Sequence, residues 1–126
     1  MKFPVIELVD RYTIALVKHK RTNGANQQEL DFYTEQMQEF DLPAIQGYID
    51  QLVHIHNKIW NMEDDFKKRR IDGASLEEIG QRALDIRDLN NFRVQYKNRI
   101  AEMVGCSVRE IKQDHSSEWH TELIFF

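Results

Sequence analysis

The sequence predicts an all-α protein. We expect one domain over residues 1–126, with a long antiparallel helical hairpin, two shorter N-terminal helices packed on it and a short extended C-terminal tail. The chain has only two prolines and five glycines, so few positions force a helix to end. Apolar residues recur every three or four positions through most of the chain. A turn at Ile71-Asp72-Gly73-Ala74 separates the two longest periodic segments, which makes them partners in a hairpin.

The first two helices are predicted over about residues 4–21 and 26–40. Pro4 suits the first turn of a helix, where its missing N–H costs nothing. Asn26, followed three residues later by Glu29, resembles a capping box at the start of the second helix. Each helix has one apolar stripe, made of Val5, Leu8, Val9, Tyr12 and Leu16 in the first and of Leu30, Tyr33, Met37 and Phe40 in the second.

The hairpin helices are predicted over about residues 42–70 and 75–104. Asp41 is a natural N-cap for the first, which would be about 40 Å long at 1.5 Å per residue. Ser75 and Glu78 form a capping box for the second, and Gly105 ends it. In the tail, residues 105–126, the alternation around Val108 indicates a short extended piece. We expect its apolar end to dock, and leftover apolar surface of this kind to support a homo-oligomer.

Composition excludes several classes of protein. The formal net charge of −4 argues against a general affinity for nucleic acid. The basic run Lys67-Lys68-Arg69-Arg70 fits a helix C-terminus, where positive charge complements the helix dipole. No stretch approaches the roughly 20 apolar residues of a membrane span, and Glu7 and Asp10 interrupt any signal-peptide pattern. With a single cysteine, Cys106, these features predict a cytoplasmic protein without a membrane partner.

Polar residues occupy the middle of both predicted hairpin seams. The 4-3 spacing gives one seam of Ile45, Ile49, Leu52, His56, Ile59, Glu63 and Phe66, and another of Leu76, Ile79, Ala83, Ile86, Asn90, Arg93, Lys97, Ile100 and Val104. A turn at Asp72-Gly73 sets His56 opposite Asn90, so the polar positions meet. Because an unpaired buried polar group costs about 1 to 3 kcal/mol, these residues must find partners or line a wet cleft. Asp10 of the first helix is a candidate partner.

Three interpretations follow from this polar seam. Arg93 and Lys97 lie one turn apart with Asn90 on the same face, which suits phosphate or carboxylate and predicts an anionic small molecule such as a sugar phosphate or nucleotide. The expected ligand-binding residues are His56, Asn90, Arg93, Lys97, Glu63 and Asp10, with Tyr48 nearby. Alternatively, the seam is a structural layer that sets the register of the bundle.

The third interpretation is a magnesium-dependent enzyme. Glu63, Asp64, Asp85 and Asp88 could form a carboxylate cluster across the hairpin, as in all-α nucleotide pyrophosphohydrolases. Glu63 and Asp64 lack the carboxylate three or four positions earlier that the full pattern has. No cofactor is predicted, and a zinc site is not expected because His56 and Glu63 are two helical turns apart.

Four motifs also resemble an uncharacterised bacterial and phage family, which is catalogued only as a domain of unknown function. They are Glu7-Leu8-Val9-Asp10-Arg11, His56 with Trp60 and Glu63-Asp64, Asn90 with Arg93 and Lys97, and Glu110 with Lys112. Asn91 and Arg109 depart from the family pattern, which has Asp and Glu at those positions. The family has no established activity to carry over, although its members resemble genes near surface-polysaccharide and nucleotide-sugar functions. The resemblance therefore slightly favours a phosphosugar or nucleotide ligand, and its motif residues coincide with the residues of the polar seam.

Overall fold

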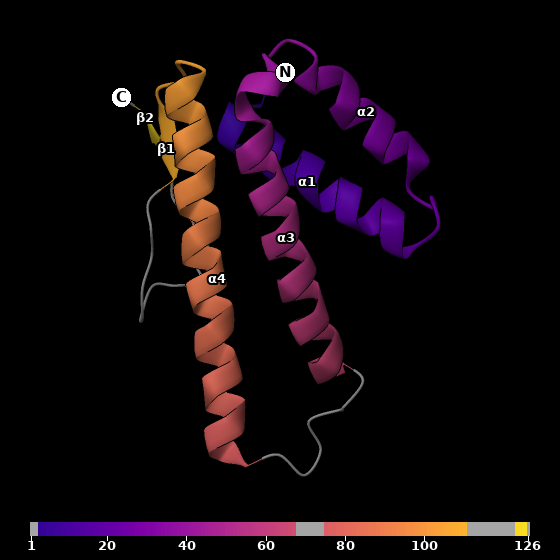
Figure 1. Cartoon of the computed structure of the whole chain (residues 1–126), viewed down its shortest axis with the longest axis vertical. Helices are drawn as coiled ribbons and strands as arrows, with labels where there is room; N and C mark the ends of the chain where they lie inside the picture. The colour runs from indigo at the N-terminus through magenta and orange to yellow at the C-terminus, as the bar shows by residue number, and fades with distance from the viewer. Residues whose placement is uncertain (1–2, 68–74, 111–122, 126) are drawn as a thin grey trace.

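The computed structural model describes residues 3–67, 75–110 and 123–125, and it confirms the all-α hairpin (Figure 1). The helices are α1 (Val5–Arg21), α2 (Gln27–Met37), α3 (Leu42–Lys67) and α4 (Leu76–Met103). Strands β1 (Val108–Glu110) and β2 (Leu123–Phe125) pair antiparallel, with Val108 opposite Phe125. Three predictions fall outside the described residues. They concern the end of the third helix near residue 70, the turn at 71–74, and Ile111 and Lys112 of the tail.

Local signals explain most of the helix ends. At the start of α4, the Ser75 side chain accepts a hydrogen bond from the Glu78 backbone N–H at 3.1 Å, as the capping box predicts. At its end, Gly105 takes a φ of +76°, and Cys106 N–H donates to the Ala101 carbonyl at 2.8 Å. This left-handed turn directs the chain back along α4 into β1.

At α2 the predicted capping box does not form as expected, and the helix ends earlier than predicted. Asn26 makes no side-chain capping hydrogen bond to the backbone of α2. Its amide instead donates to the Ala15 carbonyl of α1 at 3.1 Å, so the side chain ties the two helices together. The helix also ends at Met37 rather than near residue 40. A tertiary contact has therefore replaced the local one that the sequence pattern suggested.

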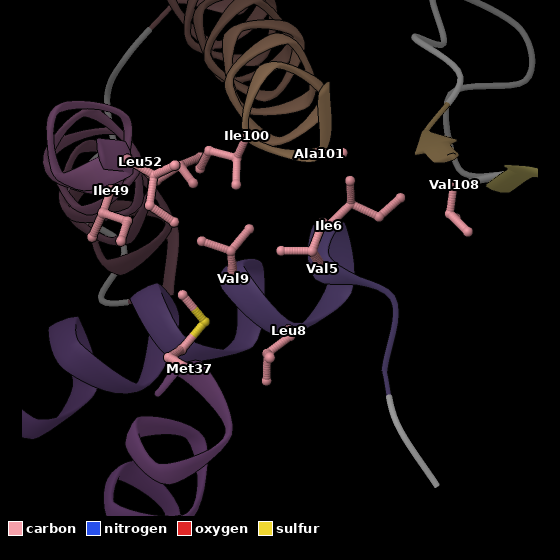
Figure 2. Close-up of a cluster of buried hydrophobic side chains, with 11 residues drawn as sticks. Val5, Ile6, Leu8, Val9, Met37, Ile49, Leu52, Ile100, Ala101 and Val108 are labelled. Atoms are coloured by element: carbon pink, nitrogen blue, oxygen red, sulfur yellow. The ribbon is translucent and has the colours of Figure 1, made fainter. Parts of the chain in front are cut away.

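Helix α1 is the centre of the fold. It packs across both helices of the hairpin and also against α2. In Figure 2, Val9 extends toward Leu52 of α3 and Ile100 of α4, whereas Leu8 extends away from the hairpin. The single stripe predicted for α1 is consequently too narrow, because a helix covered on two sides buries a wider arc. The buried residues are Val5, Ile6, Leu8, Val9, Thr13, Ala15 and Val17.

Among the residues whose burial is described, the well-buried side chains of the hairpin lie toward the end that α1 crosses. The α3 seam from Ile45 to Ile59 is buried, as is Ile100 of α4. Toward the other end, where the ribbons of α3 and α4 diverge in Figure 1, Glu63 is exposed and Leu76 is 88% exposed. The core therefore lies at one end of the hairpin.

Two further observations concern the surface. None of the helices in the described ranges is both long and apolar enough to cross a bilayer. Helix α4 exposes several large apolar side chains, namely Leu76, Leu84, Phe92 and Met103. The homo-oligomer expected from leftover apolar surface stays a prediction.

Replacing one leucine at each end of the hairpin tests where the core lies. Leu52→Ala should lower the free energy of unfolding by about 2 to 5 kcal/mol, because Leu52 is fully buried and its loss leaves a cavity. The same substitution at the exposed Leu76 should change it by less than about 0.5 kcal/mol. Urea melts of the two variants measure both values, and equal losses would contradict the one-sided core.

Candidate functional site

Asp10 of α1 is the point where polar and charged side chains from three helices meet. Its Oδ1 lies 3.2 Å from Nε2 of His56 on α3 and 3.7 Å from Nε of Arg93 on α4. Its Oδ2 lies 3.7 Å from Nζ of Lys97, one turn further along α4. The His56 imidazole and the Asp10 carboxylate are in close polar contact, but they are not aligned as in a directional hydrogen bond. One carboxylate thus joins α1 to both helices of the hairpin.

Lys97 is shared between two carboxylates. Besides Asp10, it forms an ion pair with Glu110 of β1, and both side chains of this pair are almost fully buried. Asn98 holds Glu110 in place, because its side-chain amide donates to the Glu110 carbonyl and accepts from the Glu110 N–H, each at 2.8 Å. The first strand of the tail is therefore docked on α4 by a buried charge and a paired backbone contact.

The surroundings of Asp10 keep it ionised. Burial raises the pKa of its carboxyl, but the contact with His56 and the positive charges of Arg93 and Lys97 outweigh burial and lower the pKa to about 2. A carboxylate in this position carries its charge throughout the physiological range. The cluster is therefore an ionic one, with negative charge on α1 and positive charge on α4.

A partly open pocket of about 390 Å³ lies beside this cluster. Its walls come from α1, α4 and β1, and the lining residues are Ile6, Glu7, Asp10, Arg11, Arg93, Lys97 and Glu110. Three of these side chains are acidic and three are basic, so the formal charges of the lining cancel. The pocket thus combines opposite charges from different elements on a common surface.

Arg93 is a basic residue of this lining with unused donors. Its side chain is 25% exposed, its contact with Asp10 is 3.7 Å long, and within the described ranges its guanidinium donates no hydrogen bond. Arg11 is different, because two of its nitrogens donate to Oε1 of Glu7 at 2.7 and 3.1 Å. Since a guanidinium has five N–H donors, Arg93 retains a planar fork that can bind an anion in the pocket.

The structure brings together four of the six predicted ligand-binding residues: Asp10, His56, Arg93 and Lys97. It joins His56 through Asp10 to Arg93, one turn further along α4 than the expected partner Asn90. Asn90 is half-buried and does not line the pocket. Glu63 is exposed and lies two turns beyond His56 on α3. Tyr48 lies near Tyr96, with ring centroids 6.0 Å apart, and does not line the pocket.

The carboxylates of the magnesium alternative do not form a site in the described ranges, where no three His, Cys, Asp or Glu side chains are grouped to hold a metal ion. Asp85 accepts a hydrogen bond from Gln81 at 2.9 Å, and Asp88 lies 3.9 Å from Arg87. These pairs are helix-surface contacts within α4. The four-carboxylate cluster of Glu63, Asp64, Asp85 and Asp88 is therefore not observed.

Arg11 and Glu110 are charged lining residues that spacing alone did not single out. Glu110 was marked only through the family resemblance, although its strand offered a physical signal. Val108 and Glu110 are two residues apart, so they share one face of a strand, and both are buried. A glutamate beside a buried valine on the same face requires a cationic partner, which is Lys97.

Removing each cation of the cluster tests how the charges divide their roles. Lys97→Met should lower the free energy of unfolding by about 3 to 5 kcal/mol, because it leaves the buried Glu110 carboxylate unpaired. Arg93→Met should cost only about 1 kcal/mol, because Arg93 is partly exposed and Asp10 keeps two other partners. Urea melts measure both losses, and a similar large loss for the two variants would make Arg93 part of a closed structural layer.

The lowered pKa of Asp10 predicts a pH dependence of stability. Its folded value of about 2 lies below the unfolded value of 3.8, so the stabilisation is present above about pH 4 and is lost as the pH falls toward 2. The loss should be about 2 kcal/mol. The stability gap between the native protein and Asp10→Asn should therefore shrink by this amount between pH 5 and pH 2. Asp88→Asn, at an exposed position outside the cluster, is the control variant, and parallel behaviour of the two variants would exclude this role for Asp10.

Comparisons with known proteins add no identity to this geometry. No protein-family model, curated protein or solved structure matches the chain. The resemblance to an uncharacterised family, stated above from four motifs, therefore stays a prediction. Any function must be argued from the pocket and its charges.

Proposed function

We propose that the protein binds a small molecule with one anionic group, a phosphate or a carboxylate, in the pocket beside Asp10. The observation that carries this proposal is that the Arg93 guanidinium has unused hydrogen-bond donors. Its guanidinium lines the pocket, is partly exposed and donates no hydrogen bond within the described part of the chain. Planar guanidinium groups bind phosphate and carboxylate through two parallel hydrogen bonds, and such charge-assisted bonds are roughly twice as strong as neutral ones.

The cluster behind Arg93 supports this role by orienting it. Asp10 lies nearest to Nε of the guanidinium, and Arg93 lines the pocket. Asp10 is in turn held by His56 and Lys97, which come from two different helices. An arginine whose inner nitrogen is already oriented loses less conformational freedom when a ligand binds, which favours affinity.

The size of the pocket also fits a small ligand. Its volume of about 390 Å³ lies within the range of roughly 300 to 1,000 Å³ that is typical of small-molecule sites. Three carboxylates in the lining oppose a ligand with several negative charges. Within the expected class of sugar phosphates and nucleotides, the proposal therefore favours compounds with a single phosphate.

A structural role for the rest of the cluster has its own support. Lys97 and Glu110 are almost fully buried and paired, and neither has the spare donors of Arg93. Such a layer favours one arrangement of the helices, because any slip would strand a charge in the core. We propose that Asp10, His56, Lys97 and Glu110 set the register, and that Arg93 serves the ligand.

Thermal-shift measurements and isothermal titration with anions test this division. Inorganic phosphate, a sugar monophosphate, a nucleoside monophosphate and acetate should be compared without added metal. At least one of them should raise the melting temperature of the native protein, and Arg93→Met should weaken its binding at least tenfold. Arg99→Met is the matched control, because Arg99 lies on the same helix, is exposed and pairs with Glu102 outside the pocket. An equal response of the two variants would sink the proposal.

A further inference from the structure

We infer that the ligand of this pocket is a small zwitterion, which carries an ammonium or similar cationic group as well as its anionic group. The inference rests on the proposed function and names the class of ligand more narrowly. It assigns the anionic group to Arg93 of α4 and the cationic group to Glu7 of α1. Both residues line the pocket, and they belong to different helices.

The balance of charge around the pocket favours a zwitterion over an anion. The lining holds the acids Glu7, Asp10 and Glu110 and the bases Arg11, Arg93 and Lys97. A ligand with a net negative charge would add to three existing carboxylates, whereas a zwitterion leaves the balance unchanged. Because Coulomb energies grow in a partly buried site, this difference matters more here than it would in open water.

Polar atoms of Glu7 and Arg93 also remain without partners in the described ranges. Oε1 of Glu7 accepts both hydrogen bonds from Arg11, whereas Oε2 makes no ion pair or hydrogen bond in the described ranges. Arg93 likewise keeps free donors. The pocket thus offers one available negatively charged acceptor and one set of positively charged donors, which together match the two ends of a zwitterion.

The Glu7–Arg11 pair does not prevent Glu7 from binding a ligand. The two side chains are 35% and 45% exposed, and exposed ion pairs of this kind contribute only about 0 to 1 kcal/mol. Glu7 can therefore accept a ligand ammonium on Oε2, or exchange Arg11 for it, at little cost. The apolar side chain of Ile6 lies in the same lining and can contact the carbon chain between the charged groups.

Matched ligands that differ by one ammonium group test the inference. Binding of O-phosphoethanolamine is compared with that of ethyl phosphate, and binding of β-alanine with that of propionate, by isothermal titration and by amide chemical-shift changes. In at least one pair the zwitterion should bind ten times more tightly or better. Glu7→Gln should abolish this advantage without weakening the binding of the compound that lacks the ammonium group, whereas Arg93→Met should weaken both members of the pair at least tenfold.

The control variant is Glu102→Gln, because Glu102 is exposed and lies outside the pocket, so the advantage of the zwitterion should survive this change. If the native protein binds the zwitterion and its partner without the ammonium group equally well, the inference is overturned and the proposed anion site stands. An advantage that persists in Glu7→Gln also overturns it. If none of the four compounds binds, both the inference and the anion site fail for ligands of this size.

Discussion

The buried carboxylate of Asp10 is the constraint on which the arrangement of the helices depends. A charge removed from water is tolerated only if the surroundings replace its hydration, and here the replacement comes from His56 on α3 and from Arg93 and Lys97 on α4. Because these partners come from both hairpin helices, a shift of α1 along either one would separate Asp10 from a partner. The core around Val9 and Leu52 is apolar, and we propose that Asp10 selects one register among those that apolar packing would allow.

The same charges extend the constraint to the tail. Lys97 faces Asp10 on one side and Glu110 on the other, so one ammonium group links α1 to β1. Asn98 follows Lys97 in the sequence, and its side chain hydrogen-bonds both the N–H and the C=O of Glu110. It thereby satisfies backbone groups that a further strand would otherwise pair. This anchors β1, and β2 then pairs with β1. The apolar chain end expected to dock does so through this short ladder.

The fold was predictable because its signals are local. The Ser75–Glu78 capping box and the left-handed Gly105 determine the two ends of α4, and each acts within a few residues of the sequence. Spacing also identified His56, Arg93 and Lys97, because polar residues at seam positions are visible without any tertiary information. Asn26 shows the limit of such signals, since its amide bonds Ala15 of α1 instead of capping its own helix.

The errors in the site have one physical source. Pairing residues by distance from the turn treats the hairpin as two rods packed evenly along their length, which placed Glu63 and Asn90 in the polar layer. The structure buries only the half of the hairpin that α1 covers, so Glu63 lies on the surface. Glu110 entered the layer from a tail strand, and the contact that brings it there depends on the path of the chain after Gly105. No pattern within α3 or α4 contains that information.

The charged residues of the layer differ in burial, and this difference supports the proposed division between residues that stabilise the fold and residues that bind a ligand. Lys97 and Glu110 are nearly inaccessible, so their charges can act only on the protein itself. Arg93 and Glu7 lie at the border between this layer and solvent, and each keeps polar atoms without a partner in the described chain. A layer built only to hold helices together would gain from pairing those atoms, since an unused donor beside a carboxylate adds nothing to packing. These unpaired atoms belong to two different helices, and the buried charges beneath them are already paired. Such an arrangement suits a pocket that binds the two opposite charges of one small molecule.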